Sequence, residues 1–124
     1  MSVQHIAEAR TLLSAASSLA TRSRRVATGS WSRSSAFLIR QAFEALLDAL
    51  WERTSPGMTK TTLRAQLICL PEFLRNKVLA GDVSATWLAL SNACHVHPYE
   101  LAPTVEEVDR WLAVGMGFAE HLDS

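Results

Sequence analysis

The sequence predicts an all-α fold, a single-domain helical bundle of four to five helices spanning residues 1–124. Alanine and leucine dominate the chain, while glycine, proline and β-branched runs are sparse, which favours helix over sheet. Apolar residues recur at three- and four-residue steps, as they do on one face of a helix. With 124 residues and a hydrophobic fraction of 48%, the chain is long and apolar enough to bury one core.

The first predicted helix runs from about Val3 to about Arg22. The segment 23–30 breaks the apolar period and contains Gly29, so it predicts a loop or a frayed helix end. The residues expected on the buried face are Ile6, Ala9, Leu13, Ala16 and Leu19.

The second predicted helix begins near Ser32 or Ser34 and ends near Arg53. Serine is a favoured N-cap because its hydroxyl accepts a hydrogen bond from the first turn. The turn residues Ser55-Pro56-Gly57 end the helix. Its apolar stripe is the most regular of the chain and contains Ala36, Ile39, Phe43, Leu46, Leu47 and Leu50.

The middle of the chain predicts shorter elements. One helix covers about Thr61–Leu70, and Pro71 is expected to start a separate short turn or helix, since proline suits a first helical position. Gly81 predicts another break in the helical pattern. Asp82 is then the expected N-cap of a helix over about Val83–His95.

The last predicted helix has a defined start. Thr104 and Glu107 have the spacing of a capping box, in which each side chain accepts a hydrogen bond from the other residue's backbone N–H. Glu106 and Glu107 also suit the positive end of the helix dipole. The expected buried stripe contains Val108, Trp111, Leu112, Gly115, Phe118, Ala119 and Leu122.

Cysteine usage and hydropathy indicate a cytoplasmic protein. Cys69 and Cys94 are the two cysteines, so no disulfide framework is expected and a reducing compartment is the simplest setting. The N-terminal residues lack the basic segment and apolar run of a signal peptide. No apolar stretch approaches the roughly 20 residues that span a bilayer, so no membrane partner is expected.

The net charge of zero hides an asymmetry along the chain. Residues 1–40 carry six arginines and one acid, Glu8, whereas residues 79–124 carry seven acids and one base, Arg110. A basic segment of this kind can contact the phosphates of RNA. The simpler alternative is that the two ends of the chain lie side by side and neutralise each other. The candidate RNA-binding residues are Arg22, Arg24, Arg25, Arg33 and Arg40.

Candidate catalytic residues gather between the last two predicted helices, where Pro98 and Pro103 interrupt the helical pattern. A histidine there can exchange a proton near neutral pH, as cleavage of RNA at its 2′-hydroxyl requires. Such chemistry also needs a cation beside the phosphate, and this segment supplies none. The candidates are His95, His97, Asn92 and Tyr99.

Two other interpretations of this segment remain open. Cys94, His95 and His97 are metal-ligand types, but the histidines lack the spacing that places two ligands on one helix face. We therefore predict no metal and no cofactor. Alternatively, the segment has no chemistry: His95 complements the dipole at a helix C-terminus, and Tyr99 packs with its hydroxyl at the surface.

The order of these elements resembles the HEPN superfamily of small helical domains. The resemblance is carried by the alanine- and leucine-rich first helix, the second-helix segment 34–47, the short helix 61–70 and the segment 90–104 that leads into the last helix. The hallmark of the superfamily is an arginine followed after four to six residues by a histidine. His97 is similar to that histidine, but the preceding positions hold Asn92, Ser91 and Leu90, so the motif is half present.

The resemblance implies a homodimer that acts in a bacterial defence or toxin–antitoxin system. Active members form a composite ribonuclease site across a two-fold axis, and Asn92 cannot replace the permanent cation of arginine. The expected function is therefore a non-catalytic, regulatory module that binds RNA or a partner protein. One alternative is a metal-independent endoribonuclease that uses His97 with an arginine supplied from elsewhere. The other is a structural subunit of a larger assembly.

Overall fold

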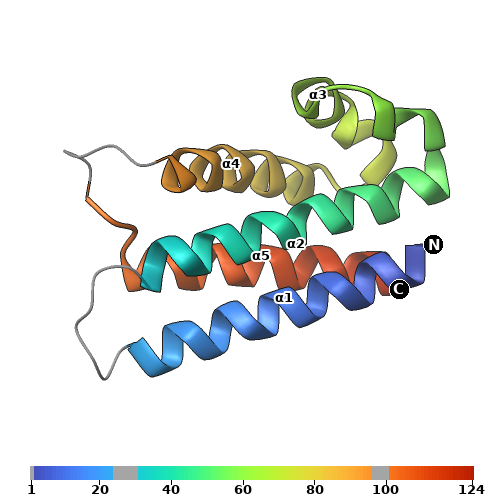
Figure 1. The fold of residues 1–124 in the computed structure, drawn as a ribbon. Helices are drawn as coiled ribbons and strands as arrows, with labels where there is room; N and C mark the ends of the chain where they lie inside the picture. Colours follow the sequence, from blue (N-terminus) through green and yellow to red (C-terminus); the bar gives the residue numbers. More distant parts are fainter. Residues whose placement is uncertain (1, 24–30, 96–100) are drawn as a thin grey trace.

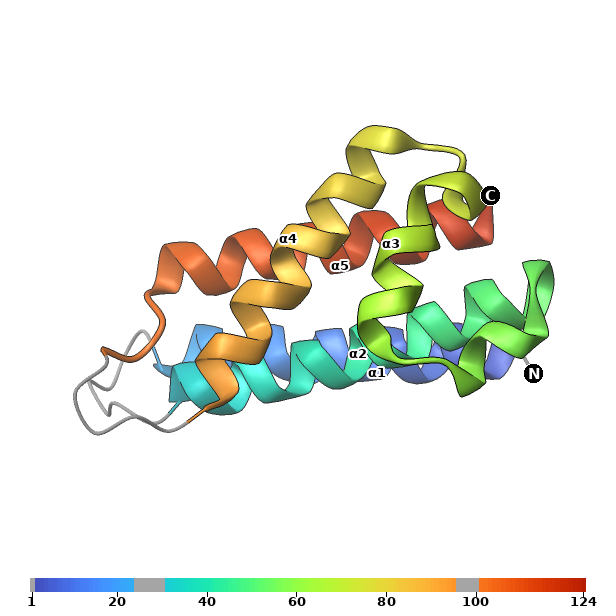
Figure 2. The ribbon, with the colours of Figure 1, turned by 90° about the horizontal axis from the view of Figure 1, so that it is seen from above.

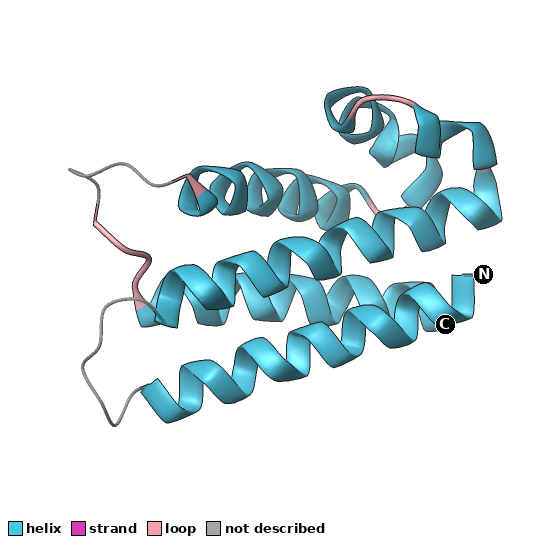
Figure 3. Cartoon of the chain, in the orientation of Figure 1, coloured by secondary structure: helices cyan, strands magenta, loops and turns pink. Residues whose placement is uncertain are grey.

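The structure is a computed structural model that describes residues 2–23, 31–95 and 101–124. Within these ranges the chain is helical and contains no strand, which confirms the all-α bundle (Figures 1 and 3). No helix among them combines the length and the apolar character needed to cross a membrane. The elements are α1 (Ser2–Ser23), α2 (Trp31–Thr54), the 3₁₀ helix η1 (Pro56–Lys60), α3 (Leu63–Leu74), α4 (Lys77–Cys94) and α5 (Val105–Asp123).

Helices α1, α2 and α5 form what we call the core layer. Helices α1 and α2 run antiparallel, and α5 packs along both of them (Figure 1). The Phe43 and Phe118 rings meet edge to face with their centroids 6.2 Å apart. Gly115 lets α5 approach closely, because a Cβ there would lie 2.9 Å from Leu13 Cδ2 and 3.1 Å from Phe43 Cε1. The stripe predicted for the last helix is buried, with Leu112 partly so.

Helices α3 and α4 form an outer layer that lies across the core layer (Figures 1 and 2). A buried side-chain pair fastens α3 to the C-terminal part of α2: Trp51 Nε1 donates to Gln66 Oε1 over 2.9 Å. The Trp51 ring also meets Phe73 edge to face at 5.4 Å. Trp87 and Leu90 attach α4 through their buried side chains. His121 Nε2 donates to the Leu74 carbonyl over 2.8 Å and joins α5 to the end of α3.

The prediction of a separate turn beginning at Pro71 is wrong, because α3 continues through it. The helix begins after Thr62, whose hydroxyl accepts from the Ala65 N–H over 3.2 Å. Leu70 and Leu74 are buried on either side of the proline and hold both turns against the rest of the bundle. Proline removes one backbone donor from a helix, and the burial of its neighbours compensates for that loss.

The predicted start of the next helix at Asp82 is also wrong. Helix α4 begins six residues earlier, after the N-cap Asn76, whose Oδ1 accepts from the Leu79 N–H over 3.0 Å. Gly81 and Asp82 lie inside the helix on its exposed side. A glycine in a helix interior costs only about 1 kcal/mol, which the tertiary packing of α4 outweighs.

The other helix ends follow the sequence closely. Helix α1 ends at Ser23, and residues 24–30 of the predicted loop lie outside the described residues. Helix α2 begins at Trp31, within a residue of one predicted cap, and the turn after it continues as η1. The capping box at α5 is confirmed: the Thr104 hydroxyl accepts from the Glu107 N–H, and Glu107 Oε1 from the Thr104 N–H, both over 3.1 Å.

Candidate functional site

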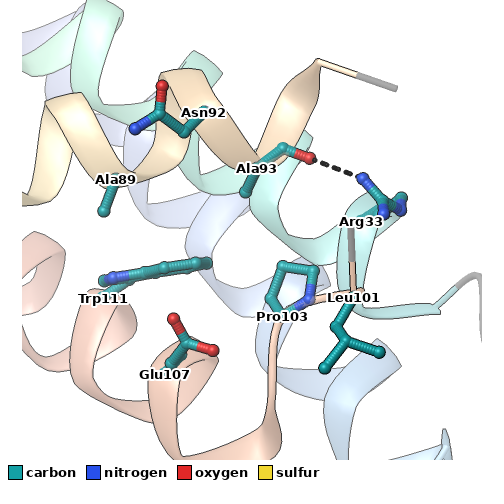
Figure 4. Close-up of a pocket in the computed structure, with 8 residues that line it drawn as sticks. All are labelled: Arg33, Ala89, Asn92, Ala93, Leu101, Pro103, Glu107 and Trp111. Carbon is teal, nitrogen blue, oxygen red and sulfur yellow. Dashed lines mark hydrogen bonds between the residues drawn. The ribbon is translucent and has the colours of Figure 1, made fainter. Parts of the chain in front are cut away.

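The candidate site lies at the end of the bundle where α4 ends and α5 begins, beside the first turn of α2. A hollow of about 260 Å³ opens there, shown in Figure 4. Arg33 and Asn92 line it with Glu107, and the half-buried Pro103 and buried Trp111 form its apolar part. The hollow therefore combines one cation, one amide and one carboxylate with an aromatic surface.

Arg33 places its guanidinium at the C-terminus of α4. Its Nη1 donates to the carbonyl of Ala93 over 3.4 Å (Figure 4). The same nitrogen donates to the carbonyl of His95 over 3.3 Å. The last carbonyls of a helix have no donor within the helix and carry its partial negative charge, so a guanidinium there stabilises the helix end. Arg33 thus stabilises the C-terminal end of α4.

The predicted catalytic residues divide into two groups. His97 and Tyr99 lie outside the described residues. His95 is the exposed C-cap of α4, and its backbone N–H donates to the Asn92 carbonyl over 3.2 Å. Asn92 is exposed and lines the hollow. The position of His95 agrees with the interpretation that it complements a helix C-terminus, while its role in proton transfer stays a prediction.

Among the predicted RNA-binding arginines that the structure describes, Arg40 lies apart from Arg22 and Arg33. Arg22 is exposed in the last turn of α1, and Arg33 lies in the first turn of α2 at the same end of the bundle. Arg24 and Arg25 lie outside the described residues. Arg40 is two helical turns further along α2, with its guanidinium carbon 5.2 Å from the centroid of the Trp87 ring.

Arg40 is also close to an acid of its own helix. Its Nε lies 3.7 Å from Glu44 Oε1, and the same nitrogen is buried without a hydrogen-bond acceptor. A guanidinium over the face of a tryptophan is attracted by the ring and covers its apolar surface. Arg40 therefore belongs to the contact between α2 and α4 rather than to the end of the bundle.

The acidic group of the hollow already has a structural role. Glu107 closes the capping box of α5 with Thr104, so its carboxylate oxygen is bonded to the backbone. Trp111 is 6% exposed and packs under the hollow. The described lining residues provide one cation and an apolar floor, and their carboxylate already accepts a backbone hydrogen bond.

Two pairs of titratable side chains lie at the opposite end of the bundle. His5 Nε2 lies 3.0 Å from Glu52 Oε1, joining α1 to α2. Arg10 Nε donates to Asp123 Oδ2 over 3.1 Å and joins α1 to α5. For Arg10 this confirms the expectation that basic and acidic ends of the chain neutralise each other.

Metal ligands do not converge within the described part of the chain. No group of three or more histidine, cysteine, aspartate or glutamate side chains there has the arrangement to hold an ion. Cys69 on α3 and Cys94 on α4 are free thiols and are both partly buried. The described cysteines therefore have neither the partners of a metal site nor a disulfide.

The contact between Arg33 and the end of α4 is the feature that sequence reasoning missed. The sequence predicts an RNA-binding role for Arg33 and a catalytic role for His95 and Asn92. Sixty residues separate Arg33 from Ala93, so no local spacing signals their contact. The charge imbalance of residues 1–40 marks the arginines as a group without saying which of them reaches the histidine segment.

Models of known protein families, curated proteins and solved structures yield no match to this chain. The HEPN resemblance therefore stays a hypothesis that rests on the helix order and on His97. The fold agrees with an all-α bundle of the predicted size, and the function is argued below from the residues themselves.

Proposed function

We propose that this chain is a HEPN-like module of a bacterial defence or toxin–antitoxin system that binds RNA at one end of the bundle without cleaving it. We call this end the basic end and define it by Arg22 and Arg33. The observation that carries the proposal is that the last turn of α1 and the first turn of α2, each with an arginine, lie at the end of the bundle where α4 stops. The sequence between those two helix ends supplies two more arginines, Arg24 and Arg25.

The charge along this part of the chain supports an anionic ligand. No acidic residue occurs between Glu8 and Glu44, a stretch that includes all of the first six arginines. Arg10 is paired with Asp123 at the opposite end, and Arg40 covers Trp87. The other four arginines of this stretch are Arg22 and Arg33 at the basic end, and Arg24 and Arg25 in the sequence between α1 and α2. Contacts of arginine with phosphates supply most of the affinity of RNA binding that is independent of sequence.

Two features favour binding over cleavage. The position where a HEPN enzyme carries its arginine holds Asn92, which has no charge to stabilise a phosphate in the transition state. Arg33 donates to two backbone carbonyls, so it supports the end of α4 as well as adding charge. A site with these residues is suited to hold a phosphate backbone in place.

The test is the binding of a short, fluorescently labelled single-stranded RNA, measured by anisotropy over a range of salt concentrations. We expect Arg22→Ala and the double variant Arg24→Ala/Arg25→Ala to weaken binding. Each phosphate contact that is lost should reduce the slope of log K against log salt by about 0.7. Lys60→Ala is the matched control, because Lys60 is an exposed cation on η1 beyond the far end of α2. Undetectable binding at low salt, or equal effects in the control, would rule out the proposal.

A metal-independent endoribonuclease that uses His97 is the second candidate, with Arg33 as the candidate for the arginine expected from elsewhere. Arg33 Nη1 lies 3.3 Å from the carbonyl of His95, and His95 precedes His97 by two residues in the sequence. In this case the protein would cleave RNA in the presence of EDTA, and His97→Ala and Arg33→Ala would each abolish cleavage. Cleavage that survives His97→Ala would come from a contaminant and would eliminate this candidate.

A further inference from the structure

The exposed face of α3 carries a charge pattern that is complementary to itself. Arg64, Ile68 and Glu72 follow one another at four-residue steps, so they form one ridge of the helix. All three are exposed, and Ile68 is 70% exposed. Within the part of the chain that the structure describes, neither Arg64 nor Glu72 forms an ion pair. The ridge therefore presents a cation, an apolar side chain and an anion in that order. Neither charge has an ion-pair partner among the described residues.

We propose that two copies of this chain pair through α3, antiparallel and about a two-fold axis at Ile68. The symmetry brings Arg64 of each copy opposite Glu72 of the partner subunit and forms the same ion pair twice. The two charges lie about 6 Å along the helix on either side of Ile68, a separation that both side chains can bridge. A two-fold interface requires such a self-complementary surface.

The charges within α3 are compatible with this pairing. Arg64 and Glu72 are the two charged residues of α3, so the rotation brings no other charges of this helix together. No pair of like charges is created along the helix. A parallel arrangement would instead place Arg64 beside Arg64 and Glu72 beside Glu72, which is unfavourable. The charge pattern thus selects one orientation of the second copy.

An apolar groove beside the ridge gives Ile68 of the partner subunit a place to pack. The groove lies between α3 and α4, has a volume of about 550 Å³, and is lined by Leu67, Trp87 and Leu88 besides Arg64 and Ile68. Leu88 is 62% exposed, so its burial against a second copy would remove apolar surface from water. Figure 2 views the molecule from the side on which α3 and α4 lie.

The size of the contact indicates a weak dimer. Helix α3 has 12 residues and is about 18 Å long, so the two copies bury less than the roughly 1,200 Å² of a small standard interface. The dimer should therefore form at high protein concentration. It uses the face beside the C-terminal part of α2, whereas Arg33 lies in the first turn of α2. The proposal is independent of RNA binding and of any site shared around His97.

Sedimentation equilibrium over about a hundredfold range of protein concentration, at low salt and without RNA, tests the proposal. We expect the wild type to dimerise. Arg64→Glu and Glu72→Arg should each raise the dissociation constant at least about tenfold, because each puts like charges opposite one another twice. The double variant Arg64→Glu/Glu72→Arg should restore the dimer, since it re-forms both pairs with the signs exchanged.

Two controls accompany these variants. Glu120→Arg reverses an exposed charge on α5 and should leave the dissociation constant unchanged. Far-ultraviolet circular dichroism of every variant checks that the helices remain, as expected for exposed positions. A wild type that stays monomeric throughout would overturn the proposal. A dimer unaffected by the single charge reversals, or a double variant that fails to restore it, would do the same.

Discussion

The core layer and the outer layer of this bundle use their helices differently. Helix α2 buries 12 of its 24 residues, whereas α3 buries three of its 12. The outer layer also holds Ile68, Val78 and Leu88, each more than 60% exposed. This difference in burial indicates that the contacts among α1, α2 and α5 provide most of the stability of the fold. The helices laid across them keep surface available for other molecules.

Phe43→Ala gives the largest expected contrast between the layers. Phe43 is fully buried against Phe118, and its removal should lower the free energy of unfolding by about 3–5 kcal/mol. Leu88→Ala in the outer layer should change it by less than about 0.5 kcal/mol. Urea denaturation followed by circular dichroism measures both. Similar losses for the two variants would mean that the layers do not differ in stability.

Gly115→Val tests how closely the core layer is packed. The added side chain would meet Leu13 and Phe43, whose atoms already lie 2.9 and 3.1 Å from the position of a Cβ. We expect a loss of about 1–3 kcal/mol in the free energy of unfolding. Gly117→Ala is the matched control on the same helix, because a Cβ there meets nothing within 4 Å. It should gain up to about 1 kcal/mol from helix propensity, and a loss there would contradict the packing described for α5.

Gln66→Leu tests the attachment of the outer layer. The variant removes the acceptor of the buried Trp51 N–H, which should cost about 1–3 kcal/mol in the free energy of unfolding. Hydrogen exchange should show faster exchange in α3 with little change in α1. Gln41→Leu, at an exposed position of α2, is the control and should be nearly neutral. Uniform acceleration across all helices would show that the two layers unfold as one unit.

Asp48→Asn gives the smallest expected effect, at the contact between α1 and α2. Burial raises the pKa of Asp48 above 3.8, Glu52 and Glu8 act in the same direction, and His5 opposes them. The folded protein therefore keeps this proton to higher pH than the unfolded chain, so ionisation of Asp48 lowers stability as the pH rises through its raised pKa. The variant should be slightly more stable than the wild type at neutral pH.

Thermal melts over a range of pH measure this difference. The gain of Asp48→Asn should shrink as the pH falls through the raised pKa and vanish below 3.8, where the aspartate is protonated in both states. A variant that is less stable at neutral pH would show that the attraction of Asp48 to His5 outweighs its burial.

The sequence predicted the core layer better than the outer layer, and the reason is physical. The long periodic stripes of α1, α2 and α5 leave little choice about which face is buried, and the capping box of Thr104 and Glu107 marks the start of α5. In α3 and α4, Pro71 and Gly81 were interpreted as boundaries because each weakens a helix locally. Tertiary contacts of Leu70 and Leu74, and of Ala80 and Val83, outweigh that weakness.

The candidate site was only partly predictable. The sequence drew attention to the segment that follows α4 and to the arginines of the first 40 residues, and the structure brings Arg33 to His95. The sequence did not predict that Arg40 lies over Trp87, because these two residues are 47 positions apart in the chain. Local patterns identify groups of residues, whereas the partners of long side chains depend on how the helices pack.

The guanidinium of Arg53 forms hydrogen bonds near both ends of the described chain. Arg53 donates through Nε to the Ser2 hydroxyl over 3.1 Å and through Nη1 to the carbonyl of Leu122. Any polypeptide attached before α1 or after α5 would therefore leave the bundle from a single spot, as the positions of the termini in Figure 1 also suggest. That spot is opposite Arg22 and Arg33. An affinity tag or a fused fluorescent domain at either terminus would leave the arginine-rich tip accessible.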